Sequence, residues 1–113
     1  MTGGAGFGGA HLCEQLLRRG ARVTVLDKLL PRDSYLHLAG IKGELEFITA
    51  DIRDAANLKL LFARCEFETV FHTAAQPIVS ISNALPLETA EVNIAGTYNV
   101  LEACRAARRQ PVL

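Results

Sequence analysis

Residues 1–12 read MTGGAGFGGAHL, and the glycines in this stretch decide the fold. Gly3, Gly6 and Gly9 follow the spacing G-x-x-G-x-x-G. Where a buried strand turns into a helix, glycines at this spacing permit a tight turn, let a pyrophosphate approach the backbone, and let helix and strand pack closely. The N-terminus of the following helix offers unpaired amides and a partial positive charge to the same phosphates. The stretch therefore predicts a strand–loop–helix unit that binds a phosphate-bearing molecule.

The rest of the chain alternates between helical and strand patterns. The sequence predicts a helix over 10–19, a strand over 21–27, a strand over 45–51, a helix capped by Asp54, a strand over 69–75 and a long helix over 86–108. Such an alternation is typical of a doubly wound α/β fold with a parallel sheet. In these sheets, ligands bind just beyond the carboxyl ends of the strands. Asp27, Asp51 and Thr73 lie at or near three predicted strand ends, so we expect them to share one crevice.

Local signals mark where the helices begin and end. Gly20 follows the first helix and is expected to adopt the left-handed conformation of a C-cap. Asp54 is well placed to cap the next helix, and Pro86 suits the first turn of the long helix. The stretch 28–44 is polar and irregular, with room for one helical turn.

Composition and charge exclude several classes of protein. The chain has 113 residues, which predicts one domain over 1–113. Its 12 basic residues balance its 12 acidic ones, so no net charge attracts nucleic acid or an anionic membrane. The three cysteines lack the spacing of metal ligands, and no apolar run reaches the roughly 18 residues of a membrane span. We therefore expect a cytoplasmic protein with no metal site and no nucleic-acid or membrane partner.

Asp27 ends the strand that follows the glycine loop. An acid roughly 20 residues beyond such a loop accepts hydrogen bonds from the ribose diol of a dinucleotide. Because a carboxylate there repels a 2′-phosphate, Asp27 favours NAD over NADP as the cofactor. Lys28 and Arg32 lie nearby in the sequence and keep NADP as the alternative. The other interpretation of Asp27 is an exposed loop acid.

Four segments carry recognisable motifs: TGGAGFGGAHL (2–12), TADIRD (49–54), VFHTAAQ (70–76) and EVNIAGTYNVLEACR (91–105). In this order they resemble the motifs of the extended short-chain dehydrogenase/reductase family, the NAD-dependent epimerases and dehydratases that act on nucleotide sugars. One departure is Gly8, which stands where the family commonly has a bulky aliphatic residue. The resemblance implies a Rossmann-type doubly wound parallel sheet that is incomplete, with its first strand and its C-terminal half missing.

The resemblance also implies which residues bind the cofactor. It implies that Asp51 accepts from the adenine amino group, that Ile52 covers the ring, and that Ala74 and Ala75 let the backbone lie against the cofactor. Asn93 is implied to contact the cofactor or to tie neighbouring strands together. A capping role for Asp51 and plain core packing for the two alanines are the alternatives. The full cofactor-binding set is Gly3, Gly6, Phe7, Gly8, Gly9, Asp27, Asp51, Ile52, Thr73, Ala74, Ala75 and Asn93.

The family chemistry needs a base that this chain lacks. Family members oxidise a sugar hydroxyl, usually at carbon 4, and pass hydride to the nicotinamide, with the tyrosine of a Y-x-x-x-K motif as the base. Tyr35 is followed four residues later by Ala39, and Tyr98 by Glu102, so neither forms the motif. We therefore expect no catalytic residue here, a base beyond residue 113, and no turnover by the chain alone. His72 is interpreted as a packing residue.

Residues 74–97, AAQPIVSISNALPLETAEVNIAGT, most resemble nucleotide-sugar 4,6-dehydratases. This resemblance implies oxidation at carbon 4, loss of water and re-reduction, with a nucleotide-diphosphate sugar as the substrate. The alternatives are a nucleotide-sugar 4-epimerase, a related reductase and a non-catalytic nucleotide sensor. Gln76, Ser80 and Ser82 are candidate substrate contacts, and the alternative for each is an ordinary solvated loop.

The predicted helix over 86–108 has apolar and small residues on more than one side. Ile94, Tyr98 and Leu101 form one stripe, while Gly96 in a helix interior indicates close packing. A helix with two apolar faces usually has two packing partners. We therefore expect either a homodimer through this helix or its burial by other parts of the same chain.

Overall fold

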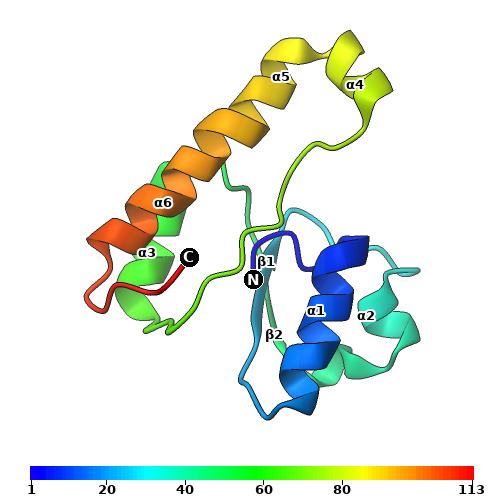
Figure 1. Cartoon of the computed structure of the whole chain (residues 1–113), viewed down its shortest axis with the longest axis vertical. Helices are drawn as coiled ribbons and strands as arrows, with labels where there is room; N and C mark the ends of the chain where they lie inside the picture. Colours follow the sequence, from blue (N-terminus) through cyan, green and yellow to red (C-terminus); the bar gives the residue numbers. More distant parts are fainter. The chain divides into compact units, whose positions relative to one another are not determined.

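A computed structural model describes residues 1–113, and Figure 1 shows their helices and strands. The chain is an α/β protein that divides into two compact units, Met1–Asp51 and Ile52–Leu113. The first unit contains the two named strands, and the second is mainly helical. No helix of the chain is both long and apolar enough to cross a membrane.

The first unit combines helices with short parallel strands. Its elements are α1 (Phe7–Arg18), β1 (Thr24–Asp27), α2 (Tyr35–Leu38), the 3₁₀ turn η1 (Ile41–Glu44) and β2 (Glu46–Thr49). β1 and β2 pair in parallel. The N-terminal residues also pair with β1: the Leu26 N–H donates to the Met1 carbonyl at 2.8 Å, and the Gly3 N–H donates to the Leu26 carbonyl at 2.9 Å. The parallel arrangement predicted from the sequence is confirmed.

Small residues of α1 form the centre of the first core. Ala10 and Cys13 are fully buried and pack in one cluster with Val25 of β1. Leu36 of α2 belongs to the same cluster, so the irregular stretch after β1 is anchored to the core. After α1, Gly20 has a φ of +79°, which is the left-handed conformation predicted for it.

The second unit is built around a pair of helices, α3 and α6. Its elements are α3 (Ala55–Arg64), α4 (Val79–Ala84), α5 (Pro86–Ala90), the π-helical turn η2 (Glu91–Gly96) and α6 (Thr97–Ala106). The Asp54 carboxylate accepts from the Asn57 N–H at 2.9 Å, which confirms the predicted cap of α3. Leu58 and Phe62 form the buried side of α3, and α3 packs against α6.

The long helix begins at Pro86 as predicted, and only one of its apolar faces is covered. Ile94, Tyr98 and Leu101 are exposed. Val100 is instead fully buried, and it lies on the helix that packs against α3. A π-helical turn interrupts the α-helical pattern between α5 and α6, and no sequence pattern had indicated it.

The predicted strand over 69–75 is extended but forms only a short pairing in this unit. The Val70 N–H donates to the Val112 carbonyl at 2.7 Å, and the Val112 N–H donates to the Glu68 carbonyl at 3.1 Å. Pro111, next to Val112, has no N–H to add to a ladder. The stretch after it, expected to be a loop, contains α4.

Candidate functional site

The glycine loop has the backbone geometry that its spacing predicts. Gly3 has a φ of +70°, a conformation that favours glycine. The Gly6 N–H donates to the Gly3 carbonyl at 3.1 Å, which closes the turn. A Cβ on Gly9 would lie 2.3 Å from the Gly3 carbonyl oxygen and 2.8 Å from the Cα of Gly4. The loop and the first turn of α1 are therefore in a contact that excludes any side chain at Gly9.

The N-terminus of α1 is suited to an anion. The helix begins after Gly6 without a side-chain cap and without an acidic residue in its first turn. Phe7 and Gly8 are exposed, and a Cβ on Gly8 would meet nothing within 4 Å. The first amides of a helix have no partner within it, and its dipole favours negative charge there. These residues therefore fit a diphosphate.

Two side chains hold the peptide groups of Ala5, at the centre of the glycine loop. One Asp27 carboxylate oxygen accepts from the Ala5 N–H at 3.0 Å, and the other accepts from the Lys28 N–H at 2.8 Å. The Ser34 hydroxyl donates to the Ala5 carbonyl at 3.3 Å. The structure thus brings Asp27 to the glycine loop, as the motif predicts. Ser34 is buried, and no pattern in the sequence singles it out.

In the second unit, the turn at Ile52 and Arg53 is held by the long helix. A Cβ on Gly96 would lie 2.5 Å from the Ile52 side chain, so the predicted close approach at Gly96 is present. The Asn99 amide donates to the carbonyls of Ile52 and Arg53 at 3.0 and 3.1 Å. Asp51, half-buried, comes directly before this turn and ends the first unit. Sequence reasoning missed Asn99.

Asn93 ties the π-helical turn to the segment that follows Thr73, Ala74 and Ala75. Its side-chain oxygen accepts from the Gln76 N–H at 2.7 Å, and its amide donates to the Gln76 carbonyl at 3.1 Å. The Asn93 side chain therefore binds both the N–H and the carbonyl of Gln76. The Asn93 side chain thus ties the helix to this segment and does not join two strands, and its contact with the cofactor stays a prediction.

Two of the three candidate substrate contacts, Gln76 and Ser82, bond to the backbone of Ile78. The Gln76 side-chain oxygen accepts from the Ile78 N–H at 2.9 Å, and the Ser82 hydroxyl donates to the Ile78 carbonyl at 3.0 Å. Ser80 is exposed on α4. These bonds shape the start of α4, which begins after Ile78 without a side-chain cap.

His72 takes part in a short chain of hydrogen bonds. The Thr97 hydroxyl donates to the Asn93 carbonyl at 2.8 Å, and His72 Nε2 lies 2.9 Å from the same hydroxyl oxygen. Because the hydroxyl proton is used, we assign the donated proton in the second bond to Nε2. Burial lowers the pKa of His72, so the ring is neutral at pH 7 and suited to packing.

Neither tyrosine is placed as a base. The Tyr35 hydroxyl donates to the Glu14 carboxylate at 3.0 Å, and this hydrogen bond raises the pKa of Tyr35. Tyr98 is exposed on α6. The structure holds no group of three or more His, Cys, Asp or Glu residues arranged to bind a metal ion.

The parallel strands, the glycine loop at the start of α1 and the acid at the end of β1 define a Rossmann-type α/β protein. Residues 1–112 match the family model described as GDP-mannose 4,6 dehydratase. The chain therefore belongs to this family, among the NAD-dependent epimerases and dehydratases indicated by its motifs.

Sequence relatives include UDP-glucose 4-epimerases. The one from Klebsiella pneumoniae is 38% identical over 112 residues, which cover 95% of this chain and 79% of that protein. The one from Mycolicibacterium smegmatis is 43% identical over 108 residues, which cover 95% of this chain but only 34% of that protein. The chain thus spans about a third of the second relative.

Solved structures of both an epimerase and a dehydratase share the fold. UDP-glucose-4-epimerase from Stenotrophomonas maltophila, with bound NAD and formylated UDP-arabinopyranose, has a TM-score of 0.82 and 33% identity, over 96% of this chain and 33% of that one. The dTDP-glucose 4,6-dehydratase from Streptomyces venezuelae, with NAD bound, has a TM-score of 0.76 and 33% identity, over 93% and 35% respectively.

Proposed function

We propose that the chain is the NAD-binding part of an enzyme that acts on a nucleotide-diphosphate sugar. The observation that carries this proposal is the glycine loop at the uncapped start of α1, with Asp27 bonded to its centre. The relatives add support, since solved structures of the same fold contain NAD. NAD, when bound, supplies the acceptor for hydride.

In this proposal, the residues of the chain bind and orient the cofactor. The amides of Phe7 and Gly8 receive the diphosphate, and Asp27 accepts from the ribose diol. A carboxylate that binds the diol repels a 2′-phosphate, which favours NAD over NADP. Asp51 and Ile52 bind the adenine, while Thr73, Ala74, Ala75 and Asn93 complete the cofactor contacts.

The test of the cofactor assignment is a titration of the protein with NAD and with NADP, using wild type and Asp27→Ala. Charge-assisted hydrogen bonds contribute about 1.5–3 kcal/mol, so NAD affinity should fall about tenfold or more. NADP affinity should change less, because the lost carboxylate also removes a repulsion. Asp33→Ala, which removes an exposed acid outside the glycine loop, is the matched control. Unchanged NAD affinity in Asp27→Ala would remove the ribose assignment.

For the reaction, we propose a 4,6-dehydratase: oxidation at sugar carbon 4, loss of water, and re-reduction. The A-A-Q segment at 74–76 and the matching family model favour this outcome. A 4-epimerase is the second candidate, favoured by the names of the relatives above. Mass spectrometry of products from the whole protein distinguishes them, because a dehydratase product is lighter by one water and an epimerase product has unchanged mass.

The 113 residues by themselves should give no turnover. Tyr35 is bonded to Glu14 and Tyr98 lacks a lysine four residues on, so this chain offers no proton acceptor of the expected kind. Incubating the chain with NAD and UDP-glucose, dTDP-glucose or GDP-mannose tests this expectation. Sustained turnover would contradict it, whereas NAD binding by a whole protein that turns over no sugar would favour a nucleotide sensor.

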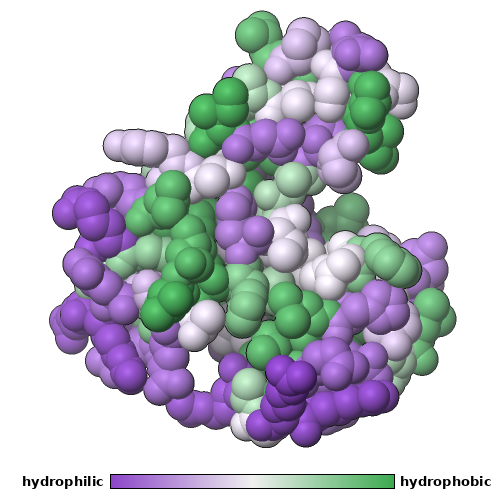
Figure 2. All heavy atoms as spheres, in the orientation of Figure 1, coloured by the Kyte–Doolittle hydropathy of each residue, from purple (hydrophilic) through white to green (hydrophobic).

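We also propose a homodimer through the 86–108 helix. Ile94, Tyr98 and Leu101 are exposed on this helix, and Figure 2 shows further exposed hydrophobic side chains, interspersed with hydrophilic ones, over α4 and α5. Burial of these residues by other parts of the whole protein is the alternative. Sedimentation of the whole protein tests the dimer: Tyr98→Glu should lower the mass to that of one protomer, and an already monomeric wild type would exclude the dimer.

A further inference from the structure

The turn at residues 52–53, after β2, is contacted by Gly96 and Asn99 of the long helix. Asn99 Nδ2 donates to the Ile52 carbonyl at 3.0 Å and to the Arg53 carbonyl at 3.1 Å. An Asn amide has two N–H donors, and here both are directed at successive carbonyls. By binding both carbonyls, the Asn99 amide fixes the orientation of the peptide group between Ile52 and Arg53.

Gly96 and Asn99 act on the same residue. They are three positions apart, so they lie on one helix face. Gly96 brings the helix backbone against the Ile52 side chain, leaving no room for a Cβ, while Asn99 binds the Ile52 carbonyl. Ile52 is therefore fixed at its side chain and at its backbone.

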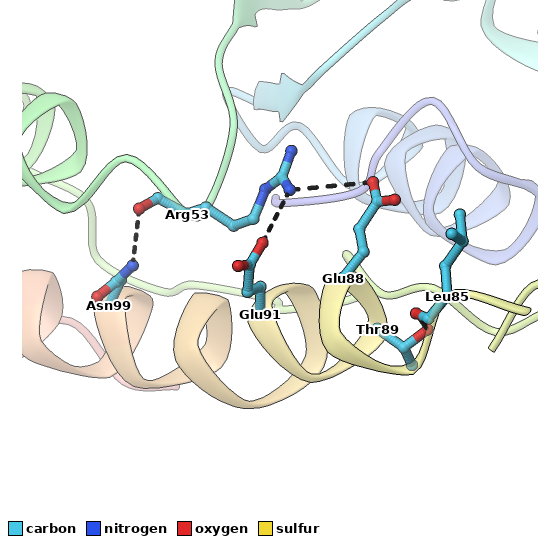
Figure 3. Close-up of polar contacts among 6 residues, drawn as sticks. All are labelled: Arg53, Leu85, Glu88, Thr89, Glu91 and Asn99. Carbon is cyan, nitrogen blue, oxygen red and sulfur yellow. Dashed lines mark hydrogen bonds and ion pairs between the residues drawn. The ribbon is translucent and has the colours of Figure 1, made fainter. Parts of the chain in front are cut away.

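The side chain of Arg53 adds a further, weaker link to the same helix. Figure 3 shows it extended along the helix, with one guanidinium nitrogen 3.4 Å from the Glu91 carboxylate and 3.9 Å from that of Glu88. All three side chains are at least one-third exposed, and exposed ion pairs contribute little. The backbone bonds of Asn99, at the other end of Arg53 in the same view, are the stronger constraint.

We infer that Asn99 is a positioning residue for adenine recognition: by holding the 52–53 peptide, it keeps Ile52 and the preceding Asp51 in the conformation that receives the base. This inference rests on the proposed function, because it takes Asp51 and Ile52 as the adenine contacts. Asn99 itself touches only protein atoms in this role. Its loss should therefore change discrimination between bases through the conformation of residues 51–53.

The experiment compares NAD with nicotinamide hypoxanthine dinucleotide, which lacks the adenine 6-amino group. Calorimetric titration of the protein should show tighter binding of NAD in the wild type. In Asn99→Asp, a side chain of the same shape loses its donors and places a carboxylate against two carbonyls. We expect its NAD affinity to fall about tenfold, because the bonds that hold the 52–53 peptide are lost, and the ratio of the two affinities to approach one.

Two further variants make the outcome decisive. Asn99→Gln keeps the donors on a longer side chain and should restore part of the preference for NAD. Asn83→Asp makes the same chemical change at an exposed position on α4 and should leave the preference unchanged. If both ligands weaken equally in Asn99→Asp and the preference remains, Asn99 is merely structural and the inference fails. A wild type that binds neither ligand would instead refute the proposed function.

Discussion

The two units hold their candidate site residues by different means. In the first unit, the loop is shaped by absent side chains: Gly3 adopts a left-handed conformation, and Gly9 leaves room for a backbone contact. In the second unit, the turns are held by side-chain amides, with Asn93 on Gln76 and Asn99 on the 52–53 carbonyls. A loop set by backbone sterics can be predicted from its own glycines, whereas the distant partner of a side-chain amide cannot be predicted from the residues around that amide.

Gly9→Ala tests the backbone contact that shapes the glycine loop, and it should have the largest effect on stability. The added Cβ would lie 2.3 Å from the Gly3 carbonyl oxygen, and backbone on both sides has little freedom to move. We expect a loss of about 3 kcal/mol in the free energy of unfolding, as for severe overpacking. Denaturant unfolding measures it.

Gly8→Ala is the matched control for that change. A Cβ on Gly8 meets nothing within 4 Å, and alanine is the better helix former by about 1 kcal/mol. Its free energy of unfolding should stay the same or rise slightly. Equal destabilisation by the two substitutions would show that the glycine loop is not held by the Gly9 contact.

Asn93→Ala tests the amide side of the comparison. The change leaves the N–H and the carbonyl of Gln76 without their side-chain partner, and each partly buried group that loses a hydrogen bond costs about 1 kcal/mol. The free energy of unfolding should fall by about 2 kcal/mol. Asn83→Ala, at an exposed position on α4, should change it by less than about 0.5 kcal/mol.

Asp54→Ala probes a local interaction in the second unit that a sequence motif did predict. The carboxylate caps α3 through the Asn57 N–H, and loss of such a cap costs about 1 kcal/mol. Asp54→Asn should restore most of the stability, since Asn is an equally good cap. If both substitutions cost the same, the charge of Asp54 and not its capping bond stabilises the helix.

The smallest expected effect is a pH dependence from His72. Burial lowers its pKa in the folded state, so the unfolded chain binds the proton more readily. Stability from this residue is therefore complete above the unfolded pKa of about 6.5 and is lost as the pH falls through the lower, folded value. Unfolding curves at pH 7.5 and 5.5 should differ less in His72→Gln than in wild type. If the difference between the two pH values is the same in His72→Gln as in wild type, other groups cause the pH dependence.

Local chemistry accounts for most of what the sequence predicted correctly. Gly20 adopts the left-handed cap and Asp54 caps α3, because each effect depends on residues within one helical turn. β1 and β2 lie within predicted runs that end on Asp27 and Asp51. The glycine spacing likewise placed the loop at the start of α1.

The features that escaped prediction depend on partners far away in the chain. Asn99 bonds to a carbonyl 47 residues earlier, and Ser34 to one 29 residues earlier. Neither partner leaves a periodic signal near the residue itself. Apolar periodicity likewise identifies the faces of the long helix but not which face is covered. Val100 is buried on the helix that packs against α3, whereas Ile94 and Tyr98 are exposed.

The π-helical turn of residues 91–96 changes the direction in which the later side chains of the long helix point around its axis. Asn93 lies within the wide turn and faces Gln76, while Asn99 lies beyond it and faces the carbonyl of Ile52. Each residue of an α-helix advances about 100° around the axis, so deleting a single residue between the two asparagines would swing one of them away from its target. Between these two asparagines, the length of the helix is therefore as constrained as the identity of the residues that make the contacts.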